Sequence, residues 1–174
     1  MIVRLTEGRL KTKFGVFREI LYYDGQKESI ALVMGDLTNA EDVLCRVHSS
    51  CIRGHVFSSI ECDCREQLET SQSLIEQSGR GIIIWFDQEG RGNGHLALLA
   101  SIKLKAEGLS QTEAYLKLGY EADARSYRRA AEILADLQVK SIVLLTDNPA
   151  KVSDLEKENI SVSGTKRIVV ETGR

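Results

Sequence analysis

The sequence has little proline, no long apolar run and almost no excess of charge, and each absence excludes a class of protein. One proline among 174 residues, with no low-complexity tract, predicts a single domain over residues 1–174 without a linker or a repeat. No segment approaches the roughly 20 apolar residues of a membrane span, so no membrane partner is expected. A net charge of −2 gives no general attraction to nucleic acid, so any anion binding must be local.

The first residues also lack an export signal. Residues 1–11 alternate apolar and charged side chains and contain no apolar run, which predicts that no signal peptide is present. The four cysteines are unevenly spaced along the chain. Free thiols in a reducing compartment are therefore expected rather than disulfides, and the predicted location is the cytoplasm.

The periodicity of the apolar residues predicts an α/β fold with a mixed sheet flanked by helices. Short β-prone runs are typical of a meander, and the run at 43–48 alternates, which places Cys45 on the core face. Residues 81–86 are apolar on both faces, as expected of a central strand. The predicted strands are 2–5, 9–17, 17–23, 30–34, 43–48, 81–86, 141–145 and 160–170, and the predicted helices lie between Cys64 and Gly79, at 96–106, 111–118 and 125–137, and after Pro149.

Three thiols, Cys51, Cys62 and Cys64, are close enough in sequence to converge on one ion. Zinc prefers thiolate or imidazole ligands in a tetrahedron, and an enzyme keeps one corner open for water, so three cysteines predict a catalytic zinc site. Two alternatives stay open. His48 or His55 would close a structural Cys3His site, and three buried free thiols would need no metal at all.

A glycine-rich segment, residues 88–95, follows the predicted central strand and precedes a predicted helix. This is where open α/β sheets bind ligands, and the exposed amides with the helix dipole favour a phosphate. Glycines alone also serve tight turns. Glu89 and Arg91 inside the segment strengthen the prediction of a ligand site.

Two cations lie where a helix dipole disfavours them. Asp123 is expected to cap a helix that begins near Arg125, and Lys151 falls in the first turn after Pro149. A cation in the first turn opposes the dipole, so Arg125 and Lys151 are interpreted as anion ligands, with solvated surface charges as the alternative.

Several motifs together resemble GTP cyclohydrolase II, the first enzyme of riboflavin synthesis, from about residue 10 to about residue 165. The motifs, in family order, are Arg46-Val-His-Ser-Ser-Cys51, Cys62-Asp-Cys64 with Gln67-Leu68, Gln88-Glu-Gly-Arg91, Leu118-Gly-Tyr-Glu-Ala-Asp123 with Arg125, and Leu145-Thr-Asp-Asn-Pro149 with Lys151. The resemblance implies a three-layer fold and zinc-activated water that attacks C8 of the guanine of GTP, with release of formate and diphosphate.

The resemblance also implies roles for individual residues. The three thiols would bind zinc, Mg²⁺ would assist at the substrate phosphates, and the protein would be a homodimer. Asp123 would be the proton acceptor and Arg125 the nucleophile, although a guanidinium with a pKa above about 12 is better suited to stabilise charge at phosphate. Glu89 is the further catalytic candidate. Substrate contacts would fall on Arg46, Val47, His48, Ser49, Ser50, Gln67, Glu89, Gly90, Arg91, Gln111, Thr146 and Lys151.

This sequence departs from the family pattern near the metal and in the helix after the glycine segment. Ile102 stands where the family has a tyrosine, which predicts an impaired late proton transfer and a reaction that halts at a ring-opened formamide. Further departures are Arg53-Gly54-His55, Glu61, Arg65, Gln111 in place of a threonine unless Thr112 takes its place, and the missing Gly-Arg-Asn tail. The alternatives are therefore ring opening of another heterocycle in specialised or degradative metabolism and a non-catalytic protein that binds zinc and nucleotide.

Overall fold

A computed structural model describes residues 1–170 of the chain, so the last four residues of the predicted domain lie outside the described part. Its centre is a seven-stranded mixed sheet in the order β1-β2-β3-β5-β4-β6-β7. The strands are β1 (Val3–Thr12), β2 (Gly15–Tyr23), β3 (Glu28–Met34), β4 (Val43–Ser49), β5 (Gly81–Phe86), β6 (Ile142–Leu145) and β7 (Val162–Lys166). The predicted α/β class with a mixed sheet is confirmed.

The N-terminal strands β1, β2 and β3 form the predicted antiparallel meander, but its divisions were placed wrongly. Three short runs were predicted before residue 24, whereas two long strands are present. Gly8 does not interrupt β1, because it pairs with Glu19 in a ladder whose one irregularity lies between Arg4 and Thr6. The chain reverses instead just before Gly15, whose φ of +110° favours glycine.

Strand β5 is central, as its apolar sequence predicted, and lies between β3 and β4. It runs antiparallel to β3 and parallel to β4, so the parallel half of the sheet begins here. The alternation in β4 is also confirmed, because Cys45 is fully buried in the core. The carboxyl ends of β4, β5 and β6 therefore lie along one edge, where parallel sheets bind ligands.

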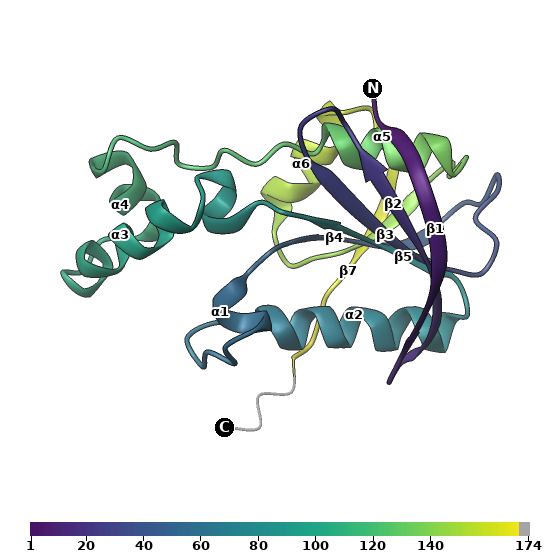
Figure 1. Ribbon diagram of the computed structural model, residues 1–174, viewed down its shortest axis with the longest axis horizontal. Coiled ribbons are helices and arrows are strands. Elements are labelled where there is room, and N and C mark those ends of the chain that lie inside the picture. The colour runs from purple at the N-terminus through teal and green to yellow at the C-terminus, as the bar shows by residue number, and fades with distance from the viewer. Residues whose placement is uncertain (171–174) are drawn as a thin grey trace.

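Helices cover both faces of the sheet and give the three layers that the family resemblance implied (Figure 1). Helix α2 (Cys64–Ser78) covers one face through Ile75, and Gly79 ends it in a left-handed conformation, as predicted. Helices α5 (Arg128–Asp136) and α6 (Pro149–Lys157) cover the other face through Ile133, Leu134 and Leu155. Among residues 1–170, no helix is long and apolar enough to cross a membrane.

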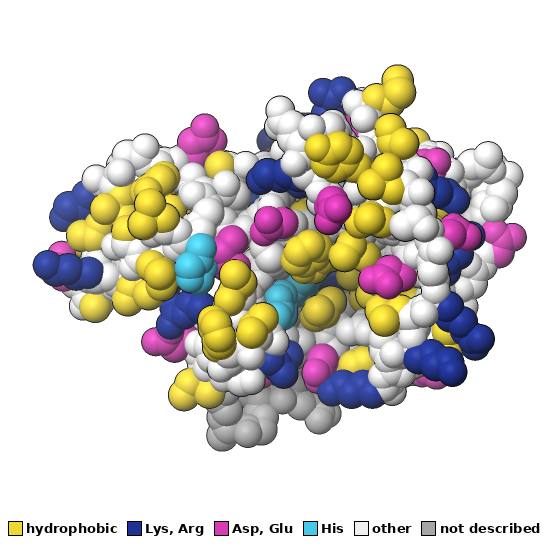
Figure 2. All heavy atoms as spheres, in the orientation of Figure 1, with side chains coloured by type: hydrophobic (Ala, Val, Ile, Leu, Met, Phe, Trp, Pro, Cys, Tyr) yellow, Lys and Arg dark blue, Asp and Glu magenta, His cyan; other side chains and the backbone are white. Residues whose placement is uncertain are grey.

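Helices α3 (His95–Ala106) and α4 (Gln111–Lys117) form a lobe that projects beyond the end of the sheet (Figure 1). Hydrophobic side chains gather on this lobe in Figure 2, and Leu96, Leu99 and Leu116 are 74%, 48% and 58% exposed. Helix α4 has a complete capping box, in which the side chains of Ser110 and Glu113 each accept a backbone N–H of the other.

The predicted start of α5 was wrong. The helix begins at Arg128 rather than Arg125, and Asp123 does not cap it. The Asp123 carboxylate accepts the backbone N–H of Arg125 at 3.1 Å and its guanidinium as well, which holds this segment as a loop. Arg125 therefore does not oppose a helix dipole, and that reason for its predicted role fails. Lys151 does lie in the first turn of α6.

Candidate metal and nucleotide site

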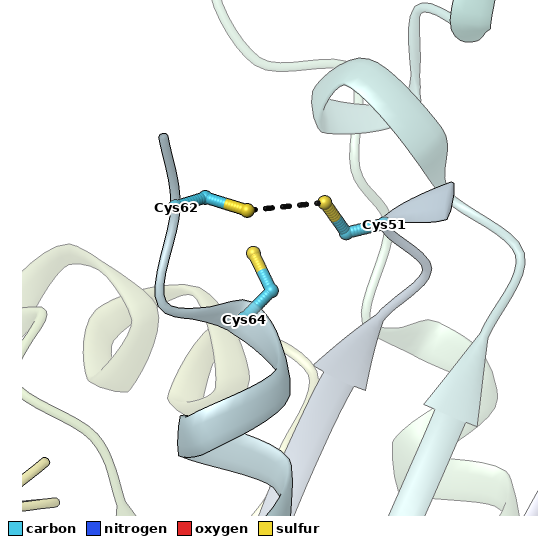
Figure 3. A group of neighbouring side chains, drawn as sticks. All are labelled: Cys51, Cys62 and Cys64. Carbon is cyan, nitrogen blue, oxygen red and sulfur yellow. Dashed lines mark hydrogen bonds between the residues drawn. The ribbon is translucent and has the colours of Figure 1, made fainter. Parts of the chain in front are cut away.

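The three predicted metal-ligand thiols converge in space (Figure 3). Cys51 precedes the short helix α1 (Ile52–His55), Cys64 opens α2, and Cys62 lies in the turn before it. The three sulfur atoms lie within 4.8 Å of one another, and the Sγ atoms of Cys51 and Cys62 are 3.7 Å apart. Three sulfurs at this spacing can bind one tetrahedral ion, so the chemistry of the donor set fits zinc.

Gly54 makes the convergence possible. A Cβ atom at this position would lie 2.9 Å from the Cys62 sulfur and 3.2 Å from Cys64 Cβ, so a larger residue would push the thiols apart. In residues 1–170 these thiols form one cluster of candidate ligands, and no histidine nitrogen belongs to it. The geometry therefore favours an open fourth corner over the closed Cys3His alternative.

Burial raises the pKa of the Cys51 and Cys64 thiols. At Cys64 the charges that the neighbouring sulfurs of Cys51 and Cys62 would carry raise the pKa further. A divalent cation reverses this preference, because it stabilises the thiolates that otherwise repel one another. Burial also raises the pKa of Cys45, to about 12. This thiol lies in the core, away from the cluster of three, so its role is structural.

A series of polar contacts links the sheet to the thiol segment. Arg46 Nε donates to His48 Nδ1 at 3.3 Å, and the Nε2 atoms of His48 and His55 are 2.9 Å apart. His55 Nδ1 in turn accepts the backbone N–H of Cys51 at 3.2 Å. The predicted common face of Arg46 and His48 therefore does lead toward Cys51, and His55 supports the metal segment without belonging to the thiol cluster.

A cavity of about 280 Å³ lies at the carboxyl ends of β4 and β6. Its lining includes three cations, Arg46, Arg125 and Lys151, from three separate parts of the chain. Lys151 Nζ donates to the Val47 carbonyl, and burial followed by the charges of Arg46 and Arg125 lowers the pKa of Lys151 well below its ordinary value. Three cations held together at partial burial favour a multiply charged anion such as a polyphosphate.

Hydrogen bonds fix Arg46 and the Thr146–Asn148 segment at this cavity. Gln67 Oε1 accepts from Arg46 Nη2 at 2.5 Å, and Arg46 Nη1 donates to the Leu145 carbonyl at 2.9 Å. Thr146 is buried, and its hydroxyl accepts the backbone N–H of Asn148. Val47 offers only its backbone, because its side chain is part of the core.

The glycine-rich segment forms a tight turn, η1 (Glu89–Gly92), that connects the two parts of the site. The buried Glu89 carboxylate accepts the backbone N–H of Ile52, next to Cys51, at 2.9 Å. Gly90 and Arg91 have φ values of +59° and +55°, and a Cβ at Gly92 would lie 2.7 Å from the backbone of Ala124.

This turn also contacts the loop that carries Asp123 and Arg125. The Arg91 carbonyl accepts the backbone N–H of Ala124 at 2.9 Å, and Arg91 Nη1 donates to Thr112 Oγ1 at 3.0 Å. The turn therefore links the metal segment, helix α4 and the loop at residues 121–127.

Asp123 and Arg125 form an ion pair with a shortest distance of 2.5 Å. Burial raises the pKa of Asp123, but hydrogen bonds from Arg125 outweigh it and lower the pKa overall. The same hydrogen bond raises the pKa of Arg125 against the effect of its burial. The guanidinium is therefore held in its charged form, which suits charge stabilisation and not nucleophilic attack.

The predicted contacts Ser49 and Ser50 lie at the end of β4. Ser50 Oγ donates to Asp87 at 3.2 Å, and Ser49 Oγ is buried without a hydrogen-bond partner among the described residues. The predicted contact Gln111 is not brought to the thiols or to the cationic cavity, because its amide donates to Ser101 on α3 at 2.8 Å. Its neighbour Thr112 contacts Arg91, which favours the one-residue shift considered for the family threonine.

The unusual residues near the metal have structural contacts of their own. Arg65 donates to the Gly54 and His55 carbonyls, so it fastens α1 to the start of α2. Arg53 pairs with Glu61 across the same segment. Ile102 is 39% exposed on α3. Sequence reasoning missed Tyr115, which is fully buried on α4, and the available signal was its spacing of one helical turn from Thr112.

A larger hollow, of about 550 Å³, lies elsewhere, across β1, β2, β3 and residues 35–38. None of the predicted site residues lines it. The convergence of charged and thiol side chains, and not the size of a hollow, therefore identifies the candidate site.

Known proteins are similar in sequence to this chain over most of its length. Over residues 3–167 the chain matches the family described as GTP cyclohydrolase II. It is 44% identical over 173 residues to "Riboflavin biosynthesis protein RibBA" of Bacillus mycoides, which covers 98% of this chain and 43% of that protein. The protein of the same name in Bacillus cytotoxicus is 44% identical over 163 residues, which covers 92% of this chain and 41% of the relative.

A solved structure shares the fold. It is "RibBX, a two domain 3,4-dihydroxy-2-butanone 4-phosphate synthase from A. baumannii", with a TM-score of 0.53 and 18% identity over 95% of this chain and 40% of that one. The chain spans less than half the length of the curated relatives that it matches. The family match and the two relatives nevertheless confirm the resemblance found in the motifs, and the chain belongs to the GTP cyclohydrolase II family.

Proposed function

We propose that this chain opens the imidazole ring of a purine nucleotide, with GTP as the first candidate, by zinc-dependent hydrolysis at C8. The observation that carries the proposal is the placement of a three-thiol cluster and a three-cation cavity on one hydrogen-bonded framework. The names of the relatives support a role in riboflavin biosynthesis.

Cys51, Cys62 and Cys64 would hold zinc. When bound, zinc supplies a Lewis acid that lowers the pKa of a coordinated water toward about 7, so that hydroxide is available at neutral pH. Glu89 and His55 hold the segment around Cys51 through its backbone N–H groups. These two residues would hold the thiol segment in a fixed position relative to the purine base of the substrate, which would lie near the Glu89–Gly92 turn.

The cationic cavity would bind the phosphates. Arg46, Lys151 and Arg125 would neutralise the phosphate oxygens, and Mg²⁺ at the same oxygens would share this charge. Asp123 would hold the Arg125 guanidinium toward the α-phosphate and would accept the proton of a water molecule that attacks the α-phosphorus as the bond to the departing diphosphate breaks. Arg125 would stabilise the negative charge that develops when diphosphate leaves, because the Asp123 carboxylate keeps it protonated.

Two of the departures from the family pattern do not argue for a different heterocycle. The Arg65 side chain donates hydrogen bonds to the Gly54 and His55 carbonyls. The Gln111 side chain donates to the Ser101 hydroxyl. These two residues therefore give no reason to replace GTP by another ring system. That the reaction halts at a formamide because of Ile102 stays a prediction.

The homodimer also stays a proposal. The exposed leucines of the α3–α4 lobe offer an apolar face of the kind that subunit contacts bury. Light scattering of the chain beside a Leu96→Glu, Leu99→Glu variant tests it: the variant should be monomeric if this face joins two subunits.

The experiment for the activity is a product assay. Zinc-loaded protein with Mg²⁺ is incubated with GTP, ATP, GDP and guanosine, and mass spectrometry measures ring-opened formamide, diaminopyrimidine, formate and diphosphate. GTP should give a ring-opened product and guanosine should react least. No ring opening of any purine by fully zinc-loaded protein would contradict the proposal, and stoichiometric formate would contradict the predicted halt.

A further inference from the structure

Four buried side-chain atoms lack a hydrogen-bond partner within residues 1–170, and they cluster near one turn. They are Ser49 Oγ, Gln88 Oε1, His95 Nδ1 and Tyr115 Oη. Ser49 ends β4 and pairs with Phe86, Gln88 directly precedes the turn, and His95 opens the helix that follows it. Because buried polar atoms are otherwise almost always paired, each of these four groups needs an explanation.

Tyr115 is the most completely buried of these residues, with 0% of its surface exposed. Its hydroxyl faces the Glu89–Gly92 turn, because a Cβ at Gly90 would lie 3.2 Å from Tyr115 Oη. Gly90 therefore gives this phenol room beneath the backbone. Thr112, one helical turn earlier, already accepts a hydrogen bond from Arg91. Helix α4 thus presents two hydroxyls to one turn, of which one is paired and one is free within the described residues.

A hydrogen bond made at Gly90 would reach both parts of the site. Glu89 holds the backbone N–H next to Cys51, and Arg91 holds the loop of Asp123 and Arg125 through Ala124. Tyr115 is therefore the phenol that this chain places against the turn.

We propose that Tyr115 is a positioning residue for the nucleotide reaction: its buried hydroxyl bonds to the Glu89–Gly90–Arg91 turn when a purine nucleotide is bound, and so fixes that turn between the metal segment and the Asp123–Arg125 loop. The inference rests on the proposed function. A bond that forms only in the bound state strengthens binding and turnover without stabilising the free protein.

Tyr115→Phe removes only the hydroxyl and tests the proposal in the zinc-loaded protein. Without nucleotide, the melting temperature should stay the same or rise, because an unpaired buried polar group has been removed. With GTP, kcat/KM should fall about tenfold, mainly through kcat, and the rise in melting temperature that GTP produces should shrink. Loss of a purely structural tyrosine would not leave the free protein as stable as before while it reduces the GTP-induced rise in melting temperature.

Tyr120→Phe is the matched control. The Tyr120 ring packs edge-on against the Tyr115 ring, with 6.5 Å between the ring centroids, and the Tyr120 hydroxyl is not among the buried unpaired atoms. It should leave kcat/KM and both melting temperatures unchanged. Wild-type kcat/KM with the full GTP-induced shift in Tyr115→Phe would overturn the proposal, as would a lower melting temperature of the free variant. Wild-type protein that neither melts higher with GTP nor turns over any purine would instead overturn the proposed function, and this inference with it.

Discussion

The thiol cluster and the cationic cavity are built in different ways. The three thiols come from the short segment 51–64 and are each only half-buried. The cavity draws Arg46 from β4, Arg125 from a loop and Lys151 from α6, and its Arg46 and Lys151 side chains are each 7% exposed. The first region depends on local loop geometry, whereas the second depends on the whole parallel half of the sheet.

Because of this difference, replacing a residue should affect different properties in the two regions. Removing one thiol removes a large part of the donor set, because metal binding needs several ligands at once. Removing one buried cation from the cavity also removes its repulsion of the other two, so affinity for an anion and stability of the fold move in opposite directions. Substitutions in the two regions should therefore have different signatures.

The largest expected effect is at the thiols. Cys51→Ser, Cys62→Ser and Cys64→Ser should each lose zinc and turnover. Changes to outer-shell partners already cost about 10–100-fold, so loss of a direct ligand should reduce turnover by more than about a hundredfold. Zinc content by mass spectrometry and the product assay measure the two losses together.

Cys45→Ala is the matched control for these variants. It removes the one thiol that lies in the core, so it should lower the free energy of unfolding by on the order of 1 kcal/mol and leave zinc content unchanged. A full complement of zinc in any of the three serine variants would contradict the ligand assignment.

An intermediate effect is expected in the cavity. Lys151→Met keeps the length of the side chain but removes its charge, so GTP binding should weaken by about 10–100-fold, the worth of a charged hydrogen bond. Zinc content should not change. The melting temperature should stay the same or rise, because burial lowers the pKa of Lys151 and its charged form destabilises the fold.

Lys140→Met, at an exposed lysine, gives the comparison for loss of a surface charge. It should bind GTP as the wild type does. Equal GTP affinity in Lys151→Met and Lys140→Met would show that the cavity is not part of the nucleotide site.

The smallest expected effect concerns the histidine that joins the two regions. Burial, followed by the charge of Arg46, lowers the pKa of His48 from 6.5 to about 2, so His48 stays neutral in the folded protein. The unfolded chain binds a proton below about pH 6.5, so this contribution to stability is complete above that pH and is lost as the pH falls toward the folded pKa. The slope is at most about 1.4 kcal/mol per pH unit.

His48→Asn keeps an acceptor for Arg46 and removes the titration. Urea unfolding at about pH 7 and about pH 5 should show a smaller loss of stability on acidification in the variant than in the wild type. Parallel losses in the two proteins would show that burial beside Arg46 does not keep His48 neutral.

The sequence predicted much of the fold because its strongest signals are local. The apolar run of β5, the alternation in β4 and the stop at Gly79 each follow from neighbouring residues, and all three are confirmed. The meander was divided wrongly at Gly8, because the ladder partner that keeps β1 continuous lies on another strand. The start of α5 was wrong because Asp123 bonds to Arg125 in a loop, a choice that spacing alone does not decide.

In the candidate site, too, local features could be predicted from the sequence and tertiary contacts could not. The thiols and the importance of Glu89 could be found from spacing and motif, but the bond from Glu89 to the Ile52 N–H depends on tertiary contact. Gln111 was predicted as a substrate contact and Arg65 was noted as a departure from the family pattern, and the structure gives each a protein partner. Tyr115 carried no motif, since a tyrosine on an amphipathic helix is ordinarily a core residue.

The Glu89–Gly92 turn sets a limit on how this chemistry could be transplanted. A designer who copied only the three cysteines and their glycine into another scaffold would carry over the sulfurs but leave behind the carboxylate that secures the neighbouring amide. The second loop, which the same turn secures through Ala124, would be lost as well. The smallest portable unit is therefore the strand ends together with their connecting turn, and not a metal-binding peptide.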